Sequence, residues 1–83
     1  MNKTGMNRYA QDMATKIWHN IEIEVKSQGL IIKSFCYQAG ISESVYYKHI
    51  RDVKRNTVLP DTQIDEIDRL CRALGKPLSY FMQ

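Results

Sequence analysis

The chain has 83 residues, with 12 Lys and Arg against 9 Asp and Glu, 43% hydrophobic residues, and only 4 Gly and 2 Pro. This length allows one small domain, the charge balance excludes a disordered tail, and the scarcity of Gly and Pro excludes a collagen-like or turn-dense all-β chain. Apolar runs reach at most three residues, and the N-terminal segment lacks the apolar core of a signal peptide, so we expect a cytoplasmic protein.

Hydrophobic residues in the first third of the chain recur at the spacing of one helix face. The stripe consists of Tyr9, Met13, Ile17, Ile21 and Val25, and it is widened by Ala10, Ala14 and Trp18. This pattern predicts one long amphipathic helix over residues 7–28, with Asn7 as a candidate N-cap and Gly29 just after its end. Within this helix, Trp18 is interpreted as a core residue rather than a platform for stacking nucleobases.

A short second helix and a third helix follow, joined by a tight turn. The apolar face of the second helix consists of Phe35, Cys36 and Ala39, and the helix ends at Gly40. Ser42 then caps a third helix at about 42–51, whose inner side carries Val45, Tyr46, His49 and Ile50. Because glycine takes a positive φ without steric cost, Gly40 permits two helices to cross steeply over this short connection.

The last third of the chain predicts two further helices. Pro60 marks a loop, after which Asp61 or Thr62 caps a fourth helix that ends at Gly75. The apolar face of this helix consists of Ile64, Ile67, Leu70, Cys71 and Leu74. A final apolar turn that closes over the core is formed by Leu78, Tyr80 and Phe81. We therefore predict a single all-α domain of five helices without a strand.

The outer side of the third helix is the candidate functional surface. Its polar residues are Glu43, Ser44, Tyr47, Lys48 and Arg51. Tyr46 and Tyr47 are adjacent and cannot both face inward, so Tyr46 is assigned to the core and Tyr47 to the outside. Within residues 44–56, Asp52 is the only acid and the bases are Lys48, Arg51, Lys54 and Arg55. This local excess of positive charge suits a phosphate backbone but also an ordinary solvated face. The two helices form a helix-turn-helix, whose second helix is shaped to enter a DNA major groove.

Residues 29–81 resemble the lambda-repressor-like domain of phage repressors and Xre/Cro-type bacterial regulators. The matching segments are GL at 29–30, FCYQAGIS at 35–42 and LPDTQIDEIDRLCRALGKPLSYF at 59–81, whereas residues 1–15 have no counterpart. The resemblance implies a compact lambda-repressor-like fold with an extended first helix. It implies that base edges are faced by Glu43, Ser44, Tyr47 and Lys48. It also implies that phosphates are approached by Lys33, Arg51, Lys54 and Arg55.

The leading hypothesis is therefore a sequence-specific regulator of double-stranded DNA, a repressor of the phage or mobile-element type that occupies an operator. Such modules bind two half-sites as dimers, so we expect a homodimer. The candidate dimer surfaces are the long first helix and the last turn, which holds Tyr80, Phe81 and Met82.

One departure from the family pattern and one residue of the third helix support an alternative. Family members often open the first helix of the motif with Ser/Thr-Gln, whereas this chain has Ile31 and Ile32. Glu43 repels phosphates and can accept only from cytosine N4. The alternative is a helical protein-interaction module that keeps the helix-turn-helix fold without DNA binding, with an exposed pair of isoleucines docking a partner helix.

No enzyme, cofactor, metal site or small-molecule ligand is predicted. Cys36 and Cys71 lie on apolar faces and are interpreted as buried free thiols, and neither pairs with a histidine at a zinc-binding spacing. The carboxylates of residues 61–68 match helix capping and solvation rather than general acid–base chemistry, because no partner group accompanies them.

Overall fold

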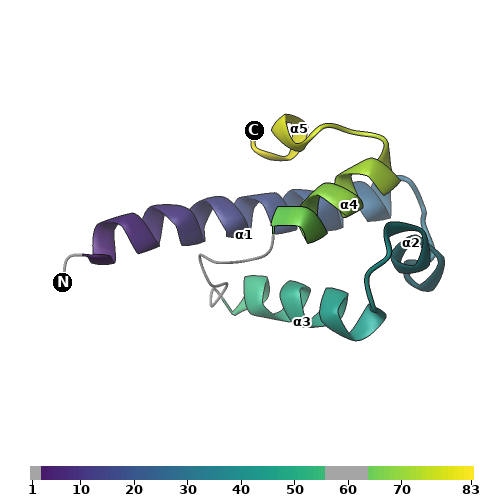
Figure 1. The fold of residues 1–83 in the computed structure, drawn as a ribbon, viewed down its shortest axis with the longest axis horizontal. Coiled ribbons are helices and arrows are strands. Elements are labelled where there is room, and N and C mark those ends of the chain that lie inside the picture. Colours follow the sequence, from purple (N-terminus) through teal and green to yellow (C-terminus); the bar gives the residue numbers. More distant parts are fainter. Residues whose placement is uncertain (1–2, 56–63) are drawn as a thin grey trace.

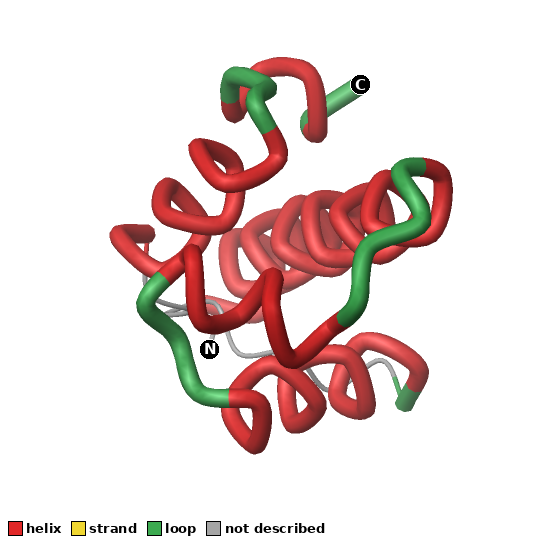
Figure 2. Tube along the Cα trace, turned by 90° about the vertical axis from the view of Figure 1, so that its right-hand side faces the viewer, coloured by secondary structure: helices red, strands yellow, loops and turns green. Residues whose placement is uncertain are grey.

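The computed structural model describes residues 3–55 and 64–83, and over these residues it contains five helices and no strand. The helices are α1 (Lys3–Ser27), α2 (Ile32–Ala39), α3 (Glu43–Lys54), α4 (Ile64–Leu74) and α5 (Leu78–Phe81). The predicted all-α fold is confirmed. The long α1 has α3 on one side and α5 on the other, while α2 packs against α3 and α4 (Figure 1). Figure 2 shows the helices from the α2 side. Their buried hydrophobic residues form one core cluster.

Trp18 lies at the centre of this core. It has no exposed surface, and it contacts α3 through an edge-on packing with Tyr46 at a centroid distance of 6.3 Å. Phe35 of α2 packs edge-on against the same Tyr46 ring at 6.0 Å. Aromatic pairs in this geometry add to the free energy gained from burial. The core positions predicted for Trp18 and Tyr46 are therefore confirmed, and one aromatic cluster joins α1, α2 and α3.

The first helix starts earlier than the sequence predicts. It begins at Lys3 rather than after Asn7, so Asn7 lies inside α1 and is not its N-cap. Extending an existing helix costs far less free energy than nucleating one, and no proline stands between these two residues to stop the extension. The predicted end is correct, since Gly29 has a φ of 66° and follows the last turn.

Two predictions for the third and fourth helices also need correction. α3 continues to Lys54 rather than ending near residue 51, because half-buried Val53 packs against the core and extends the inner face by one turn. Ile64 is 65% exposed instead of buried, because the core contacts of α4 begin one turn later, at Ile67. The predicted loop at Pro60 and the predicted caps Asp61 and Thr62 lie outside the described residues.

A polar network attaches the C-terminal turn to α1. Asn20 donates from Nδ2 to the carbonyl oxygen of Phe81 at 2.8 Å. Glu24, which is 8% exposed, accepts from Gln28 Nε2 at 2.9 Å and from the Tyr80 hydroxyl at 3.2 Å. Lys76 Nζ lies 3.6 Å from the same carboxylate. The hydrogen bond from Gln28 is the largest cause that lowers the pKa of Glu24, so the buried carboxylate stays charged and paired.

Candidate nucleic-acid interface

The turn between α2 and α3 spans residues 40–42. Gly40 has a φ of 73°, which L side chains rarely adopt. Its N–H donates to the carbonyl of Tyr37 at 3.2 Å, and the N–H of Ile41 donates to the carbonyl of Cys36 at 3.0 Å. These two bonds form a Schellman motif, which ends α2 and turns the chain sharply. Ser42 then caps α3 as predicted, its Oγ accepting from the N–H of Val45 at 3.2 Å.

A residue of α4 also holds this turn in place. Arg69 donates from Nη1 to the carbonyl oxygen of Gly40 at 2.9 Å, while its Nη2 forms an ion pair with Asp65 at 3.1 Å. Its role depends on the packing of α2 against α4, which no local pattern reveals.

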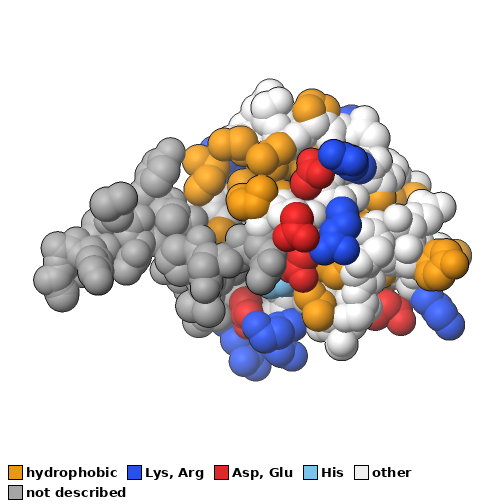
Figure 3. All heavy atoms as spheres, in the orientation of Figure 1, with side chains coloured by type: hydrophobic (Ala, Val, Ile, Leu, Met, Phe, Trp, Pro, Cys, Tyr) orange, Lys and Arg blue, Asp and Glu red, His pale blue; other side chains and the backbone are white. Residues whose placement is uncertain are grey.

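The outer face of α3 carries one continuous polar stripe. All the residues predicted there are exposed, namely Glu43, Ser44, Tyr47, Lys48, Arg51, Lys54 and Arg55. Tyr46 and Ile50, on the opposite side, are buried in the core. Lys and Arg side chains gather along the lower edge of the molecule, over the C-terminal half of α3 (Figure 3). The structure therefore brings together, on α3 and its C-cap residue Arg55, every predicted DNA-facing residue except Lys33, which is exposed on α2.

Two of the basic residues of this stripe are already paired. Lys48 Nζ lies 3.4 Å from Asp52 Oδ2, one helical turn along α3. Lys54, predicted to follow the third helix, belongs to its last turn and lies 3.6 Å from Glu22 Oε2 on α1. Exposed ion pairs of this kind contribute about 0–1 kcal/mol, so a phosphate can compete for these ammonium groups.

Three further basic residues, Lys33, Arg51 and Arg55, form no ion pair among the described residues. Their positive charges are therefore the least compensated on this side of the molecule.

The inner face of α3 is fixed by a second buried contact. The ring of His49 stacks on Trp18 with a centroid distance of 4.5 Å and an interplanar angle of 17°. Its Nε2 lies 3.2 Å from Glu66 Oε1 of α4, within hydrogen-bond distance. The predicted place of His49 on the inner side of the third helix is confirmed. α3 is thus held to α1 and α4 while its outer side chains stay exposed.

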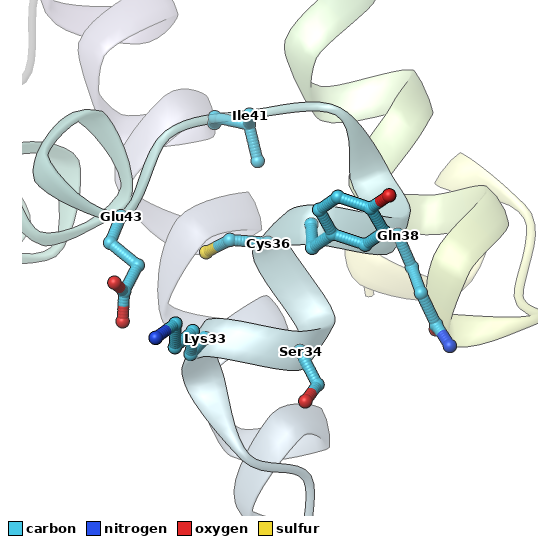
Figure 4. A pocket seen from close by; sticks show the side chains of 7 residues that line it. Lys33, Ser34, Cys36, Gln38, Ile41 and Glu43 are labelled. Atoms are coloured by element: carbon cyan, nitrogen blue, oxygen red, sulfur yellow. The ribbon is translucent and has the colours of Figure 1, made fainter.

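An open hollow of about 540 Å³ lies between α2 and the start of α3. Its lining residues are Lys33, Ser34, Cys36, Tyr37, Gln38, Ile41 and Glu43. The carboxylate of Glu43 and the side chain of Lys33 lie on the same side of this hollow, and the Cys36 thiol points into the space between α2 and α3 (Figure 4). The hollow brings α2 and α3 side chains of opposite charge onto one surface.

Apolar exposure near α2 differs from the prediction. Ile31 is 72% exposed, but Ile32 is half-buried and packs against the core, so the two do not form an exposed pair. Ile32 turns inward because it begins α2 and lies on the side of that helix that faces the core. Ile31 provides no side-chain cap for α2, as the sequence indicated. Tyr37, 87% exposed on the outer side of α2, was missed because an aromatic residue next to an apolar stretch gives no signal of exposure.

A second exposed apolar surface involves α1 and the C-terminal turn. Ile23, Tyr80 and Met82 are 52%, 41% and 40% exposed, and hydrophobic side chains gather above α1 on the face shown in Figure 3. Phe81, one of the predicted dimer candidates, is instead fully buried because it fills the core beside α1.

The cysteines are buried and free, as predicted. Burial is the largest cause that raises the pKa of Cys36 and of Cys71, with smaller contributions from the charges of Glu43 and Asp68. Both thiols are therefore held in the protonated, poorly nucleophilic form at neutral pH. Within the described residues, no group of His, Cys, Asp and Glu is placed to hold a metal ion.

Among residues 3–55 and 64–83, no helix is long and apolar enough to cross a lipid bilayer. Comparison of the chain with protein-family models, curated proteins and solved structures found no match.

Proposed function

We propose that this chain is a sequence-specific regulator of double-stranded DNA, a repressor of the phage or mobile-element type that inserts α3 into the major groove of an operator. The observation that carries the proposal is the exposed stripe of α3, which starts directly after a three-residue turn and stays polar along the whole helix. The resemblance of residues 29–81 to Xre/Cro-type regulators supplies the class of regulator.

The stripe divides naturally into two functions. In the proposed complex, its N-terminal half, with Glu43, Ser44, Tyr47 and Lys48, faces base edges. Residues of its C-terminal half, with Lys33 of α2, approach phosphates. Phosphate contacts supply affinity that falls with salt, whereas base contacts supply selection among sequences. The inner face of α3 is packed against Trp18 and Glu66 through His49. Such packing suits a recognition helix, which must present its outer side chains at a defined angle.

Homodimer formation is part of the proposal, because one module of this size makes few contacts and regulators with this motif commonly use two half-sites. The exposed residues of the C-terminal turn, Tyr80 and Met82, together with Ile23 of α1, are the candidate dimer surface.

Fluorescence anisotropy on a mixed-sequence duplex, titrated at several salt concentrations, tests the proposal. The wild-type chain should bind with a log–log salt slope that corresponds to several released counterions. The double variant Lys48→Ala/Arg51→Ala should bind more weakly at every salt concentration. It should also lower the slope by about one, because Arg51 is the proposed phosphate contact of the pair and each such contact contributes about one.

The matched control is Lys26→Ala/Arg72→Ala, which removes two positive charges from exposed positions on α1 and α4. This control should retain most of the wild-type affinity. Equal losses in both double variants would mean that net charge, and not the face of α3, attracts the duplex. Absence of binding at low salt would refute DNA binding altogether.

A protein-interaction module is the second candidate function. The observation that favours it is the exposure of Ile31 and Tyr37 on the outer side of α2, since exposed apolar side chains often mark protein contacts. Ile31→Ser/Tyr37→Ser separates the two candidates. If the chain binds DNA, this variant should keep most of the wild-type affinity and salt slope. If neither the wild type nor any variant binds DNA, the result favours a function in protein interaction.

A further inference from the structure

The start of α3 carries a carboxylate that forms no ion pair with any cation of the described residues. Glu43 is the first residue of the helix and is exposed. Lys33 lines the same hollow but forms no ion pair with it, and neither does any other described cation. The helix dipole favours negative charge in the first turn. Glu43 thus places a carboxylate on the surface that is proposed to approach polyanionic DNA.

The other polar groups at this end of α3 are partly occupied. Ser44 Oγ lies 3.2 Å from Ser42 Oγ, whose oxygen already caps the helix. Lys48 is paired with Asp52. Glu43 therefore offers the least engaged hydrogen-bonding group in the first turn of the stripe, and a carboxylate can only accept.

Resting on the proposed function, we propose that Glu43 selects cytosine at the base pair that faces the start of α3. In the major groove, guanine N7 and O6 and thymine O4 are acceptors and repel a carboxylate. Adenine places its N6 donor beside the N7 acceptor, whereas cytosine N4 is a donor without an adjacent acceptor on its own base. Cytosine is therefore the only base that offers the Glu43 carboxylate a hydrogen-bond donor without a repelling acceptor beside it on the same base.

The same carboxylate also restricts binding at other sequences. Where no cytosine N4 is in reach, binding strips water from the Glu43 carboxylate without giving it a hydrogen-bond donor. This loss costs binding free energy at sites of the wrong sequence. Glu43 thus acts as a specificity-determining residue, and its removal should raise affinity for mixed-sequence DNA while reducing selectivity.

Selection of duplexes from a random pool, followed by sequencing, tests this inference on the wild-type chain, Glu43→Gln and the control Asp68→Asn. The control removes one exposed negative charge from α4. Wild type and control should both enrich cytosine at one fixed position of each half-site. Glu43→Gln should enrich adenine there, since an amide pairs with adenine N6 and N7.

Anisotropy on the selected duplex quantifies the effect. Changing that cytosine to adenine, with its complement, should weaken wild-type binding about 5- to 150-fold, the range of a good base contact. The same change should strengthen binding of Glu43→Gln. Circular dichroism of each variant confirms that the helices are intact.

Two other outcomes are distinguishable. If wild type and Glu43→Gln enrich the same base at every position, the role of Glu43 is refuted although DNA binding stands. If no variant enriches a duplex or shows salt-dependent binding, the proposed function itself fails, and the inference about Glu43 fails with it.

Discussion

Arg69 of α4 donates a hydrogen bond to the carbonyl oxygen of Gly40, 2.9 Å away, in the turn between α2 and α3. The two residues are 29 positions apart in the chain. A left-handed turn that a neighbouring helix also holds can direct α3 in one orientation only. The proposed recognition surface therefore depends on α4, which contributes none of its predicted DNA contacts.

Gly40→Ala should destabilise the domain by roughly 1–2 kcal/mol, because its φ of 73° forces an L side chain into the left-handed region. A Cβ atom there would lie 3.5 Å from Arg69 Nη1, an ordinary contact, so the backbone carries the cost. Urea denaturation followed by circular dichroism measures it. Gly29→Ala is the control, with a similar φ of 66° and open space around its Cβ position. The free energy of unfolding should fall by a similar amount in both variants. A Gly40→Ala variant as stable as wild type would contradict the prediction.

Adjacent tyrosines of α3 should respond in opposite ways. Tyr46→Ala removes a buried ring that packs against Trp18 and Phe35 and should cost about 3–5 kcal/mol, most of the stability of a small domain. Tyr47→Ala removes a 51% exposed ring and should change stability by less than about 0.5 kcal/mol. Thermal melts compare the two. A large loss in Tyr47→Ala would place that ring in the core. If DNA binding holds, Tyr47→Ala should weaken it without unfolding the protein.

Glu24 should contribute to the acid sensitivity of the fold. Its pKa is lowered in the folded state, chiefly by the hydrogen bond from Gln28, so the stabilisation is present above the unfolded pKa and is lost as the pH falls through the folded pKa. Glu24→Gln should therefore be less stable than wild type at pH 7, and this difference should shrink below about pH 4. Urea titrations at both pH values measure it. A difference that is independent of pH would indicate lost packing rather than lost charge.

Glu22 should moderate the charge of the candidate interface. Its Oε2 atom lies 3.6 Å from the Nζ atoms of both Lys26 and Lys54. Glu22→Gln frees Lys54 for a phosphate, so affinity for a mixed-sequence duplex at low salt should rise a few-fold and the salt slope should steepen. Asp68→Asn, which also removes one negative charge, should have a smaller effect. An equal rise in both variants would point to net charge alone.

The separation between α3 and the C-terminal turn bears on how two copies can meet. α3 and α5 lie on opposite sides of α1 (Figure 1). Contacts through Tyr80 and Met82 would thus leave the stripe of α3 uncovered. The proposed dimer surface and the proposed DNA surface do not compete for the same residues.

The sequence by itself determined the helices, because the spacing of Ile17, Ile21 and Val25, the glycine at residue 40 and the cap Ser42 are local signals read within one or two turns. It also determined the two faces of α3, since the side chains of Tyr46 and Tyr47 must point apart. Where local signals were weak, as at Asn7 and at the end of α3, the predicted bounds were wrong.

Only the tertiary structure decided which side chains from distant segments meet. The contacts of Arg69 with Gly40 and of Tyr80 with Glu24 join residues 29 and 56 positions apart, and the exposure of Tyr37 depends on how α2 lies against α4. These features follow from the angles at which helices cross, and those angles are set by the packing of the whole core rather than by the pattern within any one helix.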